Sequence, residues 1–235
     1  MPKKYSKRYR KGLELVDAKN HYPLKNAVEV LAKFPKAKFN ETVEVAFRLG
    51  VDPKQSDQMV RGTVPLPHGS GKTVKVLVFA KNGAAADAAR AAGAEFVGYE
   101  EMIKKCVEGW TDFDIAIATP ESMVEVRKLG KVLGPRGLMP NPKTGTVTDD
   151  TAKAVKEVKA GRVEFKLDKS GNVHVPVGKA SFTPAQLAEN ARAVIEAVAK
   201  ARPSSVKGSY LQSCTLSATM SPPVRIDLRE FVATV

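Results

Sequence analysis

The sequence of 235 residues predicts a two-domain α/β protein, in which an inserted Rossmann-like parallel α/β domain interrupts a discontinuous α+β base domain. The middle of the chain, residues 73–161, alternates near-continuous apolar runs with helical stretches, which is typical of parallel strands covered on both faces. Both flanks instead combine alternating strands with amphipathic helices, which is typical of an antiparallel sheet with one covered face. The positive charge is concentrated in the flanks, so the two regions also differ in chemistry.

The parallel domain is predicted from three apolar runs and the helices between them. Short apolar runs indicate strands, whereas longer stretches with apolar residues three and four apart indicate helices. The expected strands are residues 74–80, 95–98 and 113–119, and the expected helices are residues 84–92, 100–109, 121–133 and 149–159. Right-handed crossovers are expected between the strands, as in nearly all such connections.

The base domain is predicted as an antiparallel sheet with two helices. Pro23 is placed as the first helical residue of the first helix, since its fixed φ suits that position. The expected helices are residues 23–34 and 184–200; the expected strands are 42–49, 58–66, 162–167, 173–177, 209–218 and 224–228, with a short hairpin at 168–172.

Domain boundaries are expected where glycine permits unusual backbone conformations. We assign residues 1–67 and 161–235 to the base domain and residues 68–160 to the inserted domain. A double-stranded interdomain hinge is expected at His68, Gly69, Gly71 and Gly161, which allows the domains to rotate relative to each other.

Charge distinguishes the two predicted domains. The whole chain carries a net charge of +13, with 38 Lys and Arg against 25 Asp and Glu. Residues 68–160 hold 14 basic and 12 acidic residues, whereas the flanks hold 24 and 13. The base domain is therefore expected to bind a polyanion.

The composition excludes several classes of protein. The longest apolar run, residues 76–80, is far shorter than the ~20 residues that cross a membrane, so no membrane partner is expected. Cys106 and Cys214 lie far apart without metal or redox spacing, which predicts two reduced, packed thiols and a cytoplasmic location.

Two regions invite comparison with nucleotide-binding motifs, and both lack residues that those motifs require. The string ending in Gly71-Lys72-Thr73 has Leu66 where a P-loop requires glycine, and a strand is expected after it where a P-loop requires a helix. No G-x-G-x-x-G follows the first parallel strand, and the three histidines are isolated. We therefore expect no enzyme, no catalytic residue, no cofactor and no metal.

Three segments carry cations that suit contacts with a polyanion. Residues 1–12 hold six cations, including Lys3 and Lys4, and two tyrosines, which suits either a phosphate-binding arm or a solvated tail. Residues 33–39 interleave three lysines with Phe34 and Phe39, of which one ring is expected in the core. Residues 130–146 hold three prolines and four glycines, which predicts an irregular loop that either contacts a polyanion through Arg136 and Lys143 or clamps the inserted sheet.

Three long strings carry a resemblance to a known family. They read GKVLGPRGLMPNPKTGTV, FNETVEVAFRLGVDPKQSDQMVRGTVPLPHG and GKASFTPAQLAENARAVIEAV. With them the chain resembles, nearly from end to end, the bacterial form of the ribosomal protein L-one family of the large-subunit stalk. The resemblance implies a base domain that binds a stalk of large-subunit ribosomal RNA, a role in movement and release of deacylated exit-site tRNA, and repression of the protein's own operon mRNA.

The resemblance also implies RNA-facing residues. They are Lys38, Phe39, Glu41, Thr42, Ser213, Thr219, Met220 and Ser221, to which we add the cations Lys36, Lys166, Lys169 and Arg225. Hydroxyls and an apolar tip suit an RNA minor groove, while lysines supply salt-sensitive phosphate contacts. Ser221 replaces the family's usual glycine, so we expect a strained positive φ or a Cβ that obstructs RNA there.

The sequence thus predicts a ribosomal, RNA-binding protein that is monomeric outside the ribosome. The alternative is a small-molecule or nucleotide-binding protein that uses the strand ends of the inserted domain, where ligands of open α/β sheets gather.

Overall fold

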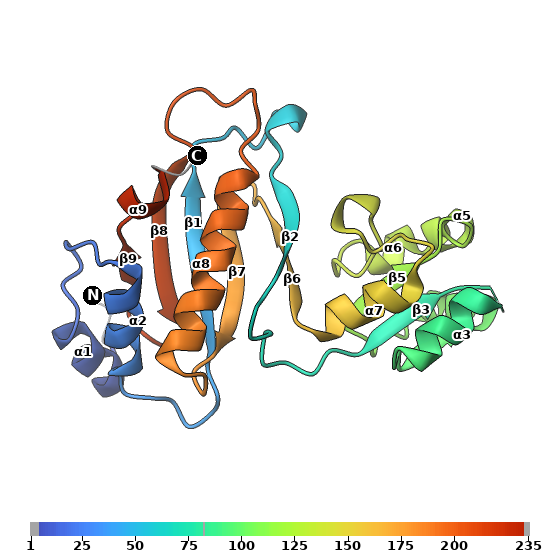
Figure 1. The fold of residues 1–235 in the computed structure, drawn as a ribbon, viewed down its shortest axis with the longest axis horizontal. Helices are drawn as coiled ribbons and strands as arrows, with labels where there is room; N and C mark the ends of the chain where they lie inside the picture. The colour runs from blue at the N-terminus through green and yellow to red at the C-terminus, as the bar shows by residue number, and fades with distance from the viewer. Residues whose placement is uncertain (1–4, 82, 233–235) are drawn as a thin grey trace. The chain divides into compact units, whose positions relative to one another are not determined.

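The computed structural model describes residues 5–81 and 83–232. They form two compact units: residues 1–71 with 163–235, and residues 72–162. Within the first unit, two segments distant in sequence fold into a common core, while the second unit is continuous in sequence (Figure 1).

A four-stranded antiparallel sheet forms the centre of the first unit, in the order β7-β1-β8-β9. Its strands are β1 (Thr42–Leu49), β7 (Asn172–Lys179), β8 (Leu211–Ala218) and β9 (Val224–Ile226). Alternate residues of β1, among them Val43, Val45 and Phe47, are buried in the core, while the residues between them are more exposed. One face of the sheet is therefore packed and the other is open, as expected of an antiparallel sheet.

Two amphipathic helices cover the packed face, α2 (Leu24–Ala32) and α8 (Pro184–Lys200). The α8 helix spans the predicted residues because its start is strongly specified: the Thr183 hydroxyl accepts the Gln186 N–H, Gln186 reaches back to Thr183, and Pro184 follows the cap. Pro23, by contrast, is the N-cap of α2 rather than its first helical residue.

Smaller elements complete the first unit. They are α1 (Lys7–Glu14), a 3-10 turn (Ser56–Gln58), β2 (Arg61–Pro65), β6 (Arg162–Lys166) and α9 (Arg229–Val232). The strands β2 and β6 pair in a separate two-stranded sheet, so the single antiparallel sheet expected for the base domain is divided into two. The tight turn of the expected hairpin at 168–172 is present, since Asp168 N–H donates to the Asn172 carbonyl at 2.8 Å and Leu167 bridges Val173. The strands on either side of this hairpin, however, pair in different sheets, β6 with β2 and β7 with β1.

The second unit contains a parallel sheet in the order β4-β3-β5. Its strands are β3 (Val76–Phe79), β4 (Phe96–Gly98) and β5 (Ile115–Ala118), and its helices are α3 (Ala84–Ala91), α4 (Glu100–Val107), α5 (Met123–Val126), α6 (Gly130–Leu133) and α7 (Thr151–Lys159).

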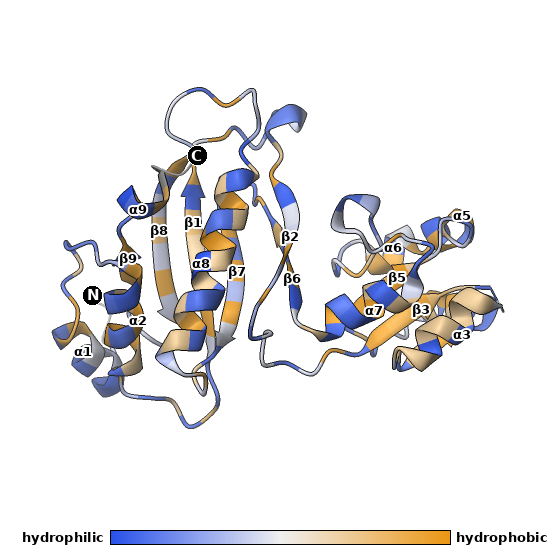
Figure 2. Ribbon diagram, in the orientation of Figure 1, coloured by the Kyte–Doolittle hydropathy of each residue, from blue (hydrophilic) through white to orange (hydrophobic). Residues whose placement is uncertain are grey.

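Both faces of the parallel sheet are covered. Val76 and Val78 pack with α3 and α7, whereas Leu77 and Phe79 pack with residues of α4, α5 and α6. All four residues of β3 are therefore fully buried, which explains the uninterrupted apolar run in the sequence. Figure 2 shows β3 hydrophobic along its length, whereas β8 alternates with more polar residues.

Three sequence predictions need correction. The expected helix at 121–133 is broken into α5, a 3-10 turn (Arg127–Leu129) and α6. The expected irregular loop after it contains a 3-10 turn (Pro142–Thr144) ended by Gly145 at a φ of 64°. The expected basic arm forms a helix from Lys7, because the Ser6 hydroxyl caps it by accepting the Tyr9 N–H; Lys3 and Lys4 lie outside the described residues.

Among the described residues, none of the helices is long and apolar enough to cross a membrane. Cys106 and Cys214 are free and buried, as predicted, and burial raises the pKa of both thiols.

Candidate nucleic-acid interface

The start of β1 and the end of β8 bring two predicted RNA-binding segments together. Thr42 N–H donates to the Thr219 hydroxyl at 3.1 Å, and Thr219 N–H donates to the Thr42 carbonyl at 3.0 Å. Lys179 of β7 donates to the Thr42 hydroxyl at 2.8 Å. Residues 177 positions apart in the chain therefore form one hydrogen-bonded cluster.

Two exposed apolar side chains border this cluster. Phe39 is 55% exposed and Met220 is 53% exposed, although both belong to types that are usually buried. Phe34, the other ring of the lysine-rich segment, is in the core, so the expectation that one ring packs inside is confirmed. Lys36 and Lys38 are exposed beside Phe39 in sequence, which gives this end of the sheet both cations and an aromatic face.

Glu41 differs from the exposed residues around it. It is only 4% exposed, and its carboxylate accepts an Arg8 guanidinium N–H at 3.4 Å and the Ala37 N–H at 3.5 Å. Its carboxylate is therefore held by neighbouring protein groups, and the salt bridge joins residues 33 positions apart.

Ser221 adopts an ordinary backbone conformation. Every described residue with positive φ is a glycine, so the expected strain at Ser221 does not occur. Its hydroxyl accepts the Ala218 N–H at 2.9 Å and donates to the Pro222 carbonyl at 3.0 Å. The serine thus closes the turn after β8 through its side chain, where a glycine would have relied on the backbone alone.

The open face of the four-stranded sheet extends from this cluster. Thr215 of β8 lies opposite Ala46 on β1 and opposite Arg225 on β9. Ser213 lies opposite Arg48, at the other end of the same strands. At about 3.4 Å per residue, the six residue steps from Ser213 to Thr219 span about 20 Å. The predicted RNA-binding residues therefore mark both ends of one polar sheet face.

A further predicted cation, Lys169, lies near the Ser213 end of the face. Lys169 is exposed at the tip of the hairpin whose Asn172 pairs with Arg48. Hydrogen bonds from the Asn172 and Ser170 backbone N–H groups hold the hairpin and lower the pKa of Asp168.

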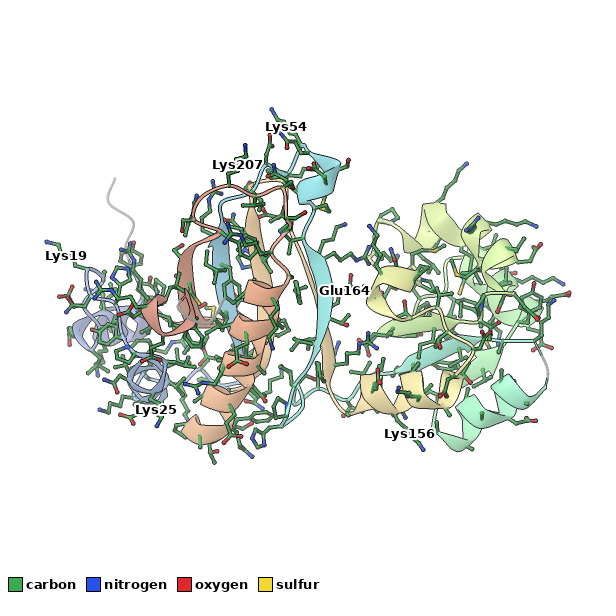
Figure 3. The ribbon with its side chains drawn as sticks, turned by 45° about the horizontal axis from the view of Figure 1, so that its top comes forward. Lys19, Lys25, Lys54, Lys156, Glu164 and Lys207 are labelled. Carbon is green, nitrogen blue, oxygen red and sulfur yellow. The ribbon has the colours of Figure 1, made fainter. Side chains whose placement is uncertain are left out.

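Lys166 is exposed on β6, the strand from which Glu164 projects (Figure 3). A hollow of about 570 Å³ lies at the Ser213 end of the open face. It is lined by His21, Gln212, Ser213, Ile226, Asp227, Leu228 and Arg229.

Sequence reasoning missed Arg48 and Lys179, and it placed Arg8 in the basic arm of residues 1–12 without its partner Glu41. Arg48 was detectable, since it follows Glu44 and Ala46 at the two-residue spacing of the open face. Arg8 carries no such signal, because only the folded chain brings it to Glu41.

Three of the four predicted hinge residues have a positive φ: Gly69, Gly71 and Gly161, at 70°, 67° and 102°. His68 and Gly69 are tied to α8 by buried Asn190, which accepts the His68 N–H at 3.0 Å and donates to the Gly69 carbonyl at 3.0 Å. The chain leaves the first unit after Gly71 and re-enters it at Val163.

The strand ends of the second unit hold a smaller, mixed-charge hollow. It has a volume of about 440 Å³ and is lined by Lys81, Arg90, Val97, Gly98, Tyr99, Glu100 and Glu101. Lys72, the lysine of the P-loop-like string, pairs with Asp114, and a strand follows it as predicted. In the part of the chain that the structure describes, no group of three or more His, Cys, Asp or Glu side chains is arranged to hold a metal ion.

The sequence also matches a known protein family. The family model of the "Ribosomal protein L1p/L10e family" matches residues 31–222, which include all of the second unit, most of the first and both segments of the hydrogen-bonded cluster. This is a family of structural, RNA-binding proteins of the large ribosomal subunit and not a class of enzymes. With a mixed α/β fold, a basic open sheet face and a family match over most of its length, the chain belongs to the Ribosomal protein L1p/L10e family.

Proposed function

We propose that the chain binds a stalk of large-subunit ribosomal RNA through the open face of its four-stranded sheet. The observation that carries this proposal is the cluster joining Thr42 to Thr219, since it places exposed Phe39 and Met220 beside a fixed set of hydroxyls. The cluster is held by main-chain and side-chain hydrogen bonds within the protein, so little ordering is needed on binding.

The chemistry of the face suits structured RNA. The wide minor groove of RNA displays 2′-hydroxyls and sugar edges, which hydroxyl side chains and flat apolar groups recognise by shape. Lys36, Lys38, Lys166, Lys169 and Arg225 would add phosphate contacts, which carry affinity without sequence information. Hydroxyl and apolar contacts are therefore assigned to specificity, and the cations to affinity.

The proposal includes the finer roles that the family resemblance implies. The protein assists the movement and release of deacylated tRNA at the exit site, and represses its own operon by binding an mRNA structure similar to the stalk. It acts in the cytoplasm and is monomeric outside the ribosome. We further propose that residues 72–162 form an inserted domain that rotates about a hinge at His68, Gly69, Gly71 and Gly161.

The test is equilibrium binding of the purified protein to the stalk fragment of its own ribosomal RNA, to its operon leader and to a scrambled duplex, across a salt series. We expect the stalk and the leader to bind at least ~100-fold more tightly than the duplex at physiological salt. Equal affinity for all three, falling together with salt, would show that the net charge alone explains binding.

Two variants test the assignment of residues. Thr219→Val removes a hydroxyl at nearly constant volume, and Met220→Ala removes an exposed apolar side chain. Each is expected to weaken stalk binding about tenfold while leaving duplex binding unchanged, since a lost polar or apolar contact costs about 1–1.5 kcal/mol. Lys54→Gln, on a loop of the first unit labelled in Figure 3, is the matched control and should change both affinities by less than about threefold.

A further inference from the structure

Helix α1 packs on the turn that carries Thr219, Met220 and Ser221. An Arg8 guanidinium N–H donates to the Met220 carbonyl at 3.4 Å. One helical turn further on, a Cβ built on Gly12 would lie 2.9 Å from the Pro222 ring, so the helix backbone directly contacts the end of the same turn. Two independent contacts therefore seat α1 beside the proposed RNA-binding cluster.

The same arginine also reaches the second segment of the cluster. Its other terminal nitrogen donates to Glu41 at 3.4 Å. Glu41 is 4% exposed, and a carboxylate that is removed from water needs an opposite charge or hydrogen-bond donors. The Glu41 carbonyl in turn accepts the Ala180 N–H at 2.8 Å, which ties this residue to the end of β7.

We propose that Arg8 is a positioning residue for RNA recognition, because it bridges the two segments that present Phe39 and Met220. This inference rests on the function proposed above. One guanidinium holds the buried Glu41 carboxylate with one nitrogen and the Met220 carbonyl with the other. Removing it leaves a buried carboxylate without its cation and the Met220 carbonyl without its hydrogen bond from α1, while the Gly12–Pro222 contact remains.

A positioning role differs measurably from a phosphate contact. A lysine or arginine that neutralises one phosphate lowers the slope of log affinity against log salt by about one when it is removed, and weakens all RNAs alike. A residue that positions the site lowers affinity for the stalk alone, with an unchanged slope. Arg10 is the matched control, since it is an exposed arginine on the same helix.

The experiment compares Arg8→Ala, Arg8→Lys and Arg10→Ala in the full-length protein, with stalk RNA and the scrambled duplex across a salt series. We expect Arg8→Ala to weaken stalk binding at least about tenfold without changing the salt slope, whereas Arg10→Ala weakens both RNAs about two- to threefold. Arg8→Lys keeps the positive charge but replaces the two terminal nitrogens of the guanidinium with one. It should therefore recover only part of the lost stalk affinity.

A double-mutant cycle with Glu41→Gln completes the test, and thermal unfolding of each variant confirms that it is folded. The effects of Arg8→Ala and Glu41→Gln on stalk affinity should be non-additive, since both remove the same interaction. Additive effects, or identical losses for Arg8→Ala and Arg10→Ala, would overturn the positioning role. If the unmodified protein does not distinguish stalk RNA from duplex, the proposed function itself fails; if it does, those outcomes refute only the role of Arg8.

Discussion

The three-stranded parallel sheet and the four-stranded antiparallel sheet of this protein are covered differently. The parallel sheet of residues 72–162 has helices on both faces, so all four residues of its central strand β3 are buried. The antiparallel sheet of the other unit has helices on one face, which leaves a second face with hydroxyl and charged side chains, among them Glu44 and Arg48. Of these two sheets, the antiparallel one has an uncovered face that is open to a large, rigid polyanion.

Positive charge is also distributed unevenly between the two units. Residues 72–162 contain 15 Lys and Arg and 12 Asp and Glu, which leaves 23 and 13 for the first unit. Many charges of the second unit are also paired, among them Lys72 with Asp114 and Lys159 with Glu95. We therefore expect the two units to respond differently to the same kind of perturbation.

Separating the units should have the largest effect. A chain in which a short Gly/Ser linker replaces residues 72–162 should keep stalk affinity within about fivefold, while residues 72–162 alone should bind at least ~100-fold more weakly. Filter binding measures both, after circular dichroism has shown that each part is folded. Tighter binding by residues 72–162 would reverse the comparison.

Asn190 should contribute strongly to the stability of the first unit, because it holds the segment at which the chain leaves that unit. It is fully buried, and it donates to the carbonyls of Gly69 and Val177 and accepts from the His68 N–H. Asn190→Leu would leave these groups unpaired, so we expect a loss of about 3 kcal/mol in the free energy of unfolding.

The measurement is denaturant unfolding followed by circular dichroism for the whole chain and by Trp110 fluorescence for the second unit, which holds the one tryptophan of the chain. The control Glu189→Gln alters an exposed side chain next to Asn190 and should change stability by less than about 0.5 kcal/mol. Equal effects of the two variants would show that the buried amide is not needed.

Removing one positive charge from each unit should affect RNA binding differently, and the difference should be moderate. Arg225→Gln on the open face should weaken stalk binding about fivefold at low salt and lower the salt slope by about one. Lys105→Gln, an exposed cation on α4, should leave both quantities unchanged. Equal losses would mean that long-range charge, and not the sheet face, attracts the RNA.

The smallest expected effect is the pH dependence of the second unit. The Lys72 ammonium and the Lys75 backbone N–H lower the pKa of Asp114 below its usual value of 3.8. A depressed carboxyl pKa stabilises the folded state above the unfolded pKa, and this stabilisation is lost as pH falls through the folded pKa.

Asp114→Asn should therefore destabilise the second unit by up to about 1 kcal/mol at pH 7, since the pair is partly exposed. The difference from the unmodified protein should shrink as pH falls below the usual carboxyl pKa and through the lower pKa of the folded state, as measured by Trp110 fluorescence. A difference that stays constant across this range would exclude the ion pair as its cause.

The sequence alone determined the class of most elements and the uneven charge. Strand β1 and helix α8 have the predicted bounds, since alternation and a capping box are local signals. The predicted helix at 121–133 was wrong, because a 3-10 turn at Arg127–Leu129 interrupts it where tertiary packing overrides helical spacing.

Only the tertiary structure decided how the candidate site is assembled. Hydrogen bonds between β1 and β8 bring Thr42 to Thr219, and a salt bridge brings Arg8 to Glu41. Such contacts depend on strand register and on how a helix packs across many intervening residues, and no local propensity encodes either. The sequence thus showed which residues carry the chemistry, whereas the fold decided which of them act together.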